Sequence, residues 1–240
     1  MNNIQRLQAL GQSIWLDYIE RQLIASGELR RLIYDVGISG VTSNPSIFDK
    51  AISGASDYDA DLRKHLDGAD AVSAEQVFFK LAVEDIQSTA DLLKPVYETS
   101  RYQDGMVSLE VSPALADDAV ATIEQARQLH GQVARRNLMI KVPATKAGLT
   151  AIETLTAEGI NVNATLLFSL NRYREVVEAY LSGLEARLRR GQPLDQIASV
   201  ASFFVSRVDT AVDHLLQEKI DGGDADHLQD LLMGCTASPL

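Results

Sequence analysis

One β/α/β unit is visible in residues 138–168, which read LMIKVPATKAGLTAIETLTAEGINVNATLLF. Its ends are two short, mostly apolar runs, Leu138–Val142 and Ile160–Phe168, of the kind that forms buried strands. The apolar residues between them recur at helical spacing: Leu149, Ile152 and Leu155. Gly159 is suited to the left-handed turn that ends a helix. This order predicts two parallel strands joined by a crossover helix.

The same alternation of strand and helix extends along the rest of the chain. Four further apolar or alternating runs predict strands over residues 14–18, 40–44, 107–112 and 200–205. The clearest helix covers Ser73–Leu93 and begins with a capping box, while Thr210 marks the expected start of a later helix. No glycine-rich phosphate-binding motif follows any of these strands, which favours a (β/α)₈ barrel over an open nucleotide-binding sheet.

We therefore predict an α/β fold of the TIM-barrel type in a single domain over residues 1–232. A closed barrel needs eight strands, whereas six are visible, so we expect an incomplete barrel with about six of its eight β/α units. Residues 233–240, MGCTASPL, have no periodicity and are expected to form an irregular C-terminal tail.

Composition excludes several classes of protein. The 240 residues are 46% hydrophobic and 23% charged, which is typical of a globular chain. A net charge of −11 and the lack of any basic run argue against binding to nucleic acid or to an anionic membrane surface. The opening MNNIQRLQALGQ lacks the apolar stretch of a secretory signal, and a single cysteine fits a reducing compartment, so we expect a cytoplasmic protein. The four histidines have no metal-ligand spacing, and we expect no metal.

Polar residues interrupt several of the predicted strands. They are Asp17, Thr42, Asn44, Glu110, Lys141, Asn161, Asn163, Thr165 and Ser202. Catalytic residues of such barrels come from the carboxyl ends of several strands, so we expect these side chains to converge at one end of the sheet.

Lys141 gives the sharpest chemical indication. A lysine between Ile140 and Val142 would be desolvated, which lowers its pKa and leaves a neutral amine that can form a Schiff base with a carbonyl substrate. Two structural alternatives remain open: Lys141 could end an edge strand, or it could form a structural ion pair with Glu110.

The other polar residues each allow a functional and a structural interpretation. Asp17 and Glu110 could act as general acid or base, or could satisfy loop backbone groups and ion pairs. Asn44 precedes a proline, which is typical of turns. Asn163 and Thr165 share one face of a buried strand and must find hydrogen-bond partners in the core or on a ligand.

Arg207 follows the sixth strand. Its guanidinium could bind a phosphate, or it could be a surface arginine paired with Asp209.

Six stretches occur together in a recognisable order. They are WLDYIERQLI, GVTSNPSIF, VSLEVSP, IKVPAT, GINVNATLLFS and FFVSRVD, and they span about residues 10 to 230. In sequence, order and spacing they resemble transaldolase of the pentose phosphate pathway, in the longer form found in many bacteria.

The resemblance implies a transferase of carbohydrate metabolism. It would move a dihydroxyacetone unit from a ketose phosphate, such as sedoheptulose 7-phosphate or fructose 6-phosphate, to an aldose phosphate, and it would need no cofactor. Lys141 would form the Schiff base, Asp17 would move protons, and Glu110 would pair with a water. The remaining residues would position this water or bind the substrate: Thr165 for the water, Asn44, Asn163 and Ser202 for the sugar, and Arg207 for the phosphate.

The chain departs from the family after the sixth unit. Family members continue through two more strands, so we interpret this chain as C-terminally shortened, with unpaired strand edges that favour association into a homo-oligomer. Two alternatives to a transaldolase follow. One is a non-catalytic fragment or pseudoenzyme that keeps the site residues by descent. The other is a Schiff-base aldolase that protonates and releases the carbanion instead of transferring it.

Overall fold

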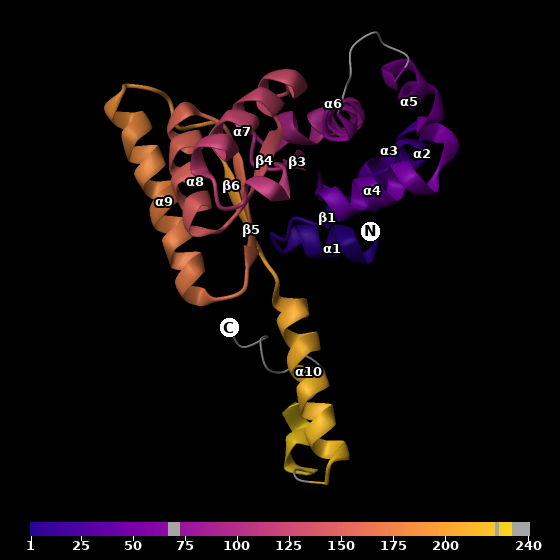
Figure 1. The fold of residues 1–240 in the computed structure, drawn as a ribbon, viewed down its shortest axis with the longest axis vertical. Helices are drawn as coiled ribbons and strands as arrows, with labels where there is room; N and C mark the ends of the chain where they lie inside the picture. Colours follow the sequence, from indigo (N-terminus) through magenta and orange to yellow (C-terminus); the bar gives the residue numbers. More distant parts are fainter. Residues whose placement is uncertain (67–72, 224–225, 232–240) are drawn as a thin grey trace.

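Six parallel strands form one curled sheet in the computed structural model, which describes residues 1–66, 73–223 and 226–231 (Figure 1). The strands are β1 (Trp15–Leu16), β2 (Gly40–Val41), β3 (Met106–Glu110), β4 (Leu138–Pro143), β5 (Val162–Leu167) and β6 (Ser199–Phe203). Each pairs with the next strand along the chain, in the order β1-β2-β3-β4-β5-β6. The predicted α/β fold with an incomplete TIM-type barrel is confirmed.

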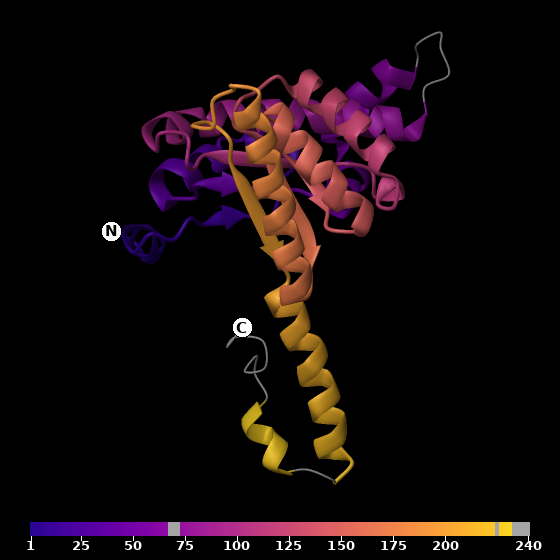
Figure 2. The ribbon, with the colours of Figure 1, turned by 90° about the vertical axis from the view of Figure 1, so that its left-hand side faces the viewer.

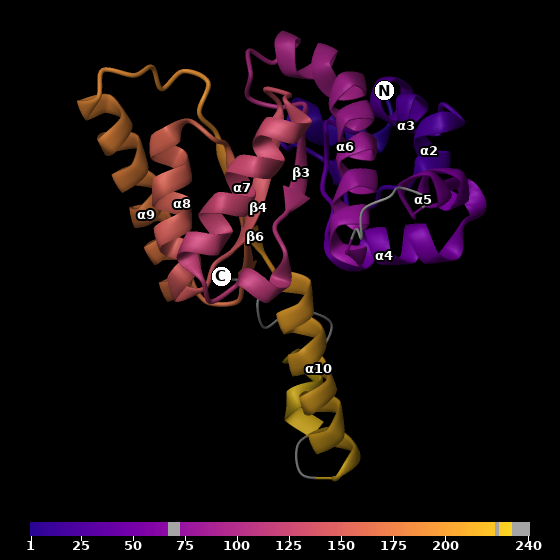
Figure 3. The same ribbon diagram turned by 45° about the horizontal axis from the view of Figure 1, so that its top comes forward.

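Helices precede, connect and follow the strands. They are α1 (Asn3–Ala9), α2 (Arg21–Ala25), α3 (Glu28–Arg31), α4 (Pro45–Gly54), α5 (Asp59–Leu66), α6 (Ala74–Thr99), α7 (Ala119–Val133), α8 (Lys146–Glu158), α9 (Leu170–Arg189) and α10 (Val205–Asp221). Short helical turns complete the chain: η1 (Leu32–Val36), η2 (Ser56–Tyr58), η3 (Pro113–Leu115) and η4 (Asp226–Leu231). α6 packs on β3, α7 on β4, α8 on β4 and β5, and α9 on β5 and β6 (Figures 1 and 3).

The alternation of side chains in the strands separates an apolar outer layer from a polar inner face. Val107, Leu109 and Val111 join the main hydrophobic core beneath the helices. Between them, Ser108 and Glu110 point to the other side of the sheet, because successive residues of a strand face opposite ways. Strand parity therefore places the polar residues of β3 inside the curl of the sheet.

Local signals define the ends of the long helices. The Ser73 hydroxyl accepts a hydrogen bond from the Gln76 N–H, and Gln76 Oε1 accepts one from the Ser73 N–H, so the predicted capping box is confirmed. This helix continues beyond the expected Leu93, through Pro95, to Thr99. Gly159 ends α8 with φ of 92°, as predicted.

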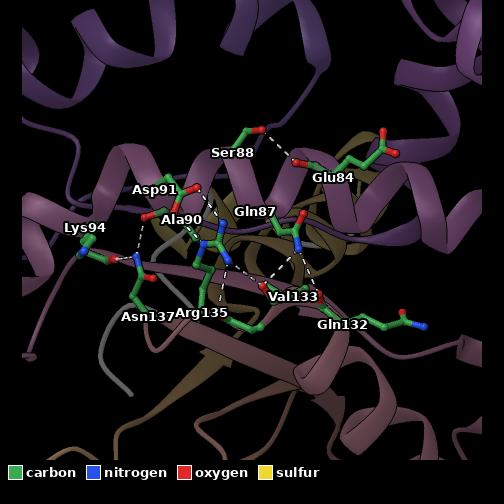
Figure 4. Close-up of polar contacts among 12 residues, drawn as sticks. Glu84, Gln87, Ser88, Ala90, Asp91, Lys94, Gln132, Val133, Arg135 and Asn137 are labelled. Carbon is green, nitrogen blue, oxygen red and sulfur yellow. Dashed lines mark hydrogen bonds and ion pairs between the residues drawn. The ribbon is translucent and has the colours of Figure 1, made fainter.

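Polar contacts fasten α6 to the segment that leads into β4 (Figure 4). Arg135 donates two hydrogen bonds to the carboxylate of Asp91, at 2.6 and 3.0 Å. Asn137 donates to the carbonyl of Ala90 at 2.9 Å. These contacts fix the entry of β4, the strand that holds Lys141.

α10 extends away from the sheet, with η4 beside it (Figures 1 and 2). The prediction that this helix starts at Thr210 is wrong, because it begins at Val205. Thr210 lies inside the helix, where its hydroxyl donates to the Ser206 carbonyl at 2.8 Å. The predicted tail, residues 233–240, lies outside the described residues. Within the described ranges, no helix has both the length and the apolar character needed to cross a membrane.

Candidate active site

A cavity of about 420 Å³ lies at the carboxyl ends of the strands. Its lining includes six of the eight residues that the sequence nominated: Asp17, Asn44, Glu110, Lys141, Thr165 and Arg207. Seven further residues complete it: Pro45, Ser46, Ile47, Lys50, Pro113, Leu166 and Phe204. The expected convergence is therefore observed for five of the nine polar strand residues, and it is not observed for Thr42, Asn161, Asn163 and Ser202, which do not line the cavity. Asn161 precedes β5 at the opposite end of that strand, where its side chain bonds the backbone of Arg136 and Ala198.

Strand register brings three of the nominated residues side by side. Glu110 of β3 pairs with Lys141 of β4, and Lys141 pairs with Asn163 of β5. Asp17 directly follows β1, and Asn44 caps the start of α4, where its Oδ1 accepts from the Ile47 N–H at 2.9 Å. The turn chemistry expected for Asn44 is thus present as a helix cap at the edge of the cavity.

Lys141 is almost fully buried, with 5% of its surface exposed. Its Nζ lies 3.3 Å from Glu110 Oε2 and donates a hydrogen bond to the Ser43 carbonyl at 3.2 Å. The alternative in which Lys141 ends an edge strand is wrong, because β4 lies between β3 and β5. The ion pair with Glu110 is formed, and both partners line the cavity.

Glu110 is placed to exchange protons. Burial raises the pKa of the Glu110 carboxyl; the Lys141 ammonium opposes this effect and the charge of Asp17 adds to it. A carboxyl with a raised pKa holds or releases a proton closer to neutral pH, which suits a general acid or base.

Asn163 lies beside Lys141 and contacts Ser202, but neither Asn163 nor Ser202 is among the residues that line the cavity. The Asn163 amide donates to the Ser108 hydroxyl at 3.0 Å, and its oxygen accepts from the Ser202 hydroxyl at 2.8 Å. The partners expected for Asn163 are therefore two serines: Ser202 of the neighbouring strand β6, and Ser108 of β3, on the far side of β4. Ser108 was not among the residues singled out from the sequence.

Thr165 differs from Asn163 in having no partner. It is 1% exposed, and its hydroxyl makes no hydrogen bond within the part of the chain that the structure describes. A buried hydroxyl without a partner is uncommon in folded proteins. Thr165 is one of the residues that line the cavity, so this unpartnered hydroxyl lies in the wall of the site.

Leu166 was missed by the sequence analysis. It has a φ of 62°, in the left-handed region that non-glycine residues rarely adopt, where the β5–β6 register shifts between Ala164 and Leu167. This irregularity turns Leu166 outward at the cavity, where it is 42% exposed. The run NATLLF has the pattern of an ordinary strand, so the irregular backbone at Leu166 could not be predicted from it.

Two cationic side chains lie on helices around the cavity. Arg207 is in the first turn of α10, with its guanidinium carbon 4.4 Å from the centroid of the Phe204 ring. Lys50 of α4 is exposed and makes no ion pair with any described residue. It was also missed, because it lies on a helix, away from any predicted strand.

The lining holds three basic side chains, Lys50, Lys141 and Arg207, and two acidic ones, Asp17 and Glu110. In a chain with net charge −11, this lining suits an anionic substrate. Among the residues with described positions, no group of three His, Cys, Asp or Glu side chains is arranged to hold a metal ion. The arrangement can perform Schiff-base chemistry on a carbonyl compound, with carboxyl groups nearby for proton transfer.

Comparison with known proteins agrees with this chemistry. The family described as Transaldolase/Fructose-6-phosphate aldolase matches residues 14–232. The chain is 46% identical over 223 residues to Transaldolase 2 of a Nostoc species, which covers 93% of this chain and 58% of that protein. It is 49% identical to transaldolase of Saccharopolyspora erythraea, over 92% of this chain and 59% of that protein. It is 50% identical to transaldolase of Thermobifida fusca, over 90% and 58%. The chain therefore spans less than three-fifths of the length of these relatives.

Proposed function

The chain belongs to the transaldolase/fructose-6-phosphate aldolase family, and on this basis we propose that it is a transaldolase. It transfers a dihydroxyacetone unit from sedoheptulose 7-phosphate or fructose 6-phosphate to an aldose phosphate through a Schiff base on Lys141. The observation that supports this most strongly is the buried Lys141 amine, 3.3 Å from a Glu110 carboxyl of raised pKa, at the carboxyl ends of parallel strands.

The proposed reaction begins when the Lys141 ammonium gives a proton to Glu110 and the neutral Nζ attacks the ketose carbonyl at C2. Glu110 then returns the proton to the carbinolamine hydroxyl, which leaves as a water held near Thr165. The resulting iminium accepts the electron pair of the C3–C4 bond as that bond breaks. Asp17 takes the proton of the C4 hydroxyl, and the aldose phosphate departs. The enamine left on Lys141 then attacks the acceptor aldehyde, Asp17 returns the proton to the new hydroxyl, and water releases the product ketose.

The cationic residues are assigned to the phosphate. Arg207 and Lys50 lie on different helices around the same cavity, and both charges favour a phosphorylated sugar. Asn44 is assigned to the substrate hydroxyls, and Asn163 with Ser202 holds the inner side of the site next to Lys141.

A second candidate is a Schiff-base aldolase, since the family description also includes fructose-6-phosphate aldolase. It would use the same lysine and differ only after bond cleavage, where the enamine is protonated and released as dihydroxyacetone. No observation favours a non-catalytic protein over these two, because the lysine, both carboxyls and the cations all line one cavity.

The proposal extends to location and assembly. Phosphorylated sugars are charged and do not cross membranes unaided, which supports a cytoplasmic location. Among the described strands, β1 and β6 each pair on one side, which supports association of these strands with a second copy of the chain.

Mass spectrometry after borohydride reduction tests the proposal. The purified chain is incubated with fructose 6-phosphate and borohydride, beside Lys141→Ala and the control Lys146→Ala, which changes a lysine at the start of α8. We expect a reduced three-carbon adduct in the original chain and in Lys146→Ala, and none in Lys141→Ala. An adduct of equal yield in Lys141→Ala, or none in the folded original chain, would contradict the proposal. Free dihydroxyacetone in the absence of acceptor would favour the aldolase candidate.

A further inference from the structure

A partly buried polar cluster begins four residues beyond Asp17, outside the cavity. Arg21 is at its centre, and we call Arg21, Tyr58, Asp61, Glu84 and Asp85 the Arg21 cluster. Arg21 Nε donates to Asp85 Oδ1 at 2.9 Å, and its two terminal nitrogens contact Asp61 and, at 3.1 Å, Glu84. The guanidinium carbon lies 4.6 Å from the centroid of the Tyr58 ring. One side chain of α2 is thus bonded to α5 and α6, which lie beside it (Figures 1 and 3).

Tyr58 and Asp85 also hold the backbone of Arg21. Tyr58 is fully buried; its hydroxyl donates to Asp85 Oδ2 at 2.7 Å and accepts from the Arg21 N–H at 3.0 Å. Burial raises the pKa of Asp85, against the opposing effects of Tyr58 and Arg21. Because the side chain and the backbone of Arg21 are bonded to the same pair of residues, both the position and the direction of the chain are set at this point.

The sheet by itself holds this part of the chain weakly. β1 contains only Trp15 and Leu16, is an outer strand, and pairs on one side with β2. Asp17 follows it and is exposed. Beyond Asp17, Ile19 is fully buried in the core, and the Arg21 cluster comes next. The segment that bears Asp17 is therefore held between a two-residue strand and these two anchors.

We propose that Arg21 is a positioning residue that, through the Arg21 cluster, holds the β1–α2 segment so that the Asp17 carboxylate stays in the cavity. This inference rests on the proposed function of Asp17. Arg21 touches no substrate, so its contribution should depend on the presence of Asp17. Lysine in its place keeps one charge but loses the planar fork that bonds three carboxylates.

A double-mutant cycle with Arg21→Lys and Asp17→Asn tests the inference. We expect Arg21→Lys to lower kcat about ten- to hundredfold, because small misplacements of a catalytic group have effects of that size, while KM changes little. In the Asp17→Asn background the same change should have less than about a twofold effect. Equal effects in both backgrounds, or an unchanged kcat, would overturn the inference.

A matched control variant and a hydrogen-exchange measurement distinguish a specific effect of Arg21 from a general effect of changing an arginine. Arg31→Lys changes an exposed arginine of α3, the helix that follows α2, where Arg31 pairs with Glu28 of the same helix. This variant should leave kcat unchanged. Hydrogen exchange of the peptide that contains residues 17–20 should be faster in Arg21→Lys and unaltered in Arg31→Lys. Equal exchange rates in both variants would overturn the inference, and this test does not require transferase activity. Failure of the proposed function is seen separately, as the lack of any adduct in the original chain. If Arg21→Lys does not fold, Tyr58→Phe removes one bond of the cluster and should show the same dependence on Asp17, with a smaller effect.

Discussion

The amine of Lys141 lies 3.3 Å from the carboxylate of Glu110, with 6% and 10% of the two side chains exposed. The residues face each other across neighbouring parallel strands at the same register position. Removing one partner of a buried ion pair costs about 3–5 kcal/mol, whereas an apolar pair in the same place is often as stable. A buried ion pair in the lining of a cavity is therefore better explained by a role in catalysis than by a contribution to the stability of the fold.

The pH dependence of catalysis should reflect the burial of Glu110. Burial raises the pKa of this carboxyl above the ordinary value of about 4.3, and a protonated Glu110 cannot accept a proton. We expect kcat/KM to be high above the pKa of Glu110 and to fall as the pH drops through it, at a higher pH than for an exposed glutamate. Glu110→Gln should lower activity and abolish this acid limb, as measured by pH–rate profiles. An identical acid limb in Glu110→Gln would assign it to another group.

The positive charges of Lys50 and Arg207 should strengthen binding of the substrate phosphate. Lys50→Gln and Arg207→Gln each remove a cation, and a hydrogen bond to a charged group contributes about 1.5–3 kcal/mol. We expect KM for glyceraldehyde 3-phosphate to rise about ten- to hundredfold in each variant, with KM for unphosphorylated glyceraldehyde nearly unchanged. Lys94→Gln, an exposed lysine of α6 that does not line this cavity, is the control. A similar loss for both acceptors would rule out a phosphate contact.

Thr165→Val should separate activity from stability. The Thr165 hydroxyl is buried without a hydrogen-bond partner in the described structure, and such a group costs about 1–3 kcal/mol. Valine keeps the shape, so we expect unfolding by urea to show equal or greater stability while kcat falls. A loss of more than about 1 kcal/mol of stability would mean that the hydroxyl has a structural partner.

Gly148→Ala should disturb the contact between α8 and β4. A Cβ atom at Gly148 would lie 1.9 Å from the Pro143 carbonyl oxygen, so the helix must move away from the end of the strand that holds Lys141. We expect a loss of about 1–3 kcal/mol in unfolding experiments, together with lower activity. Gly131→Ala in α7 is the matched control, because its Cβ would meet no atom within 4 Å. It should be neutral or gain up to about 1 kcal/mol, since alanine favours helices. Equal stabilities of the two variants would contradict the close approach.

Much of the site could be predicted from periodicity. Strand parity predicts that Lys141 and Glu110 leave the apolar outer layer, and both line the cavity. The start of α10 could not be predicted in this way, because Val205 continues an apolar run while the backbone of Phe204, with ψ of 59°, has already left the strand. The place of Lys50 in the cavity could not be predicted for another reason. An exposed lysine on a helix is common in any protein and does not indicate a binding site.

The alternation of strands and helices, and the side of each strand on which a residue lies, follow from the local spacing of apolar residues and are readable from the amino-acid order. Which of the inward-facing side chains meet depends on the three-dimensional packing. The register of β3 against β4 places Lys141 beside Glu110, and the Arg21 cluster joins Arg21 to Asp85, 64 positions further along the chain. Register and long-range contacts follow from the packing of whole elements against one another, which no local pattern of residues contains.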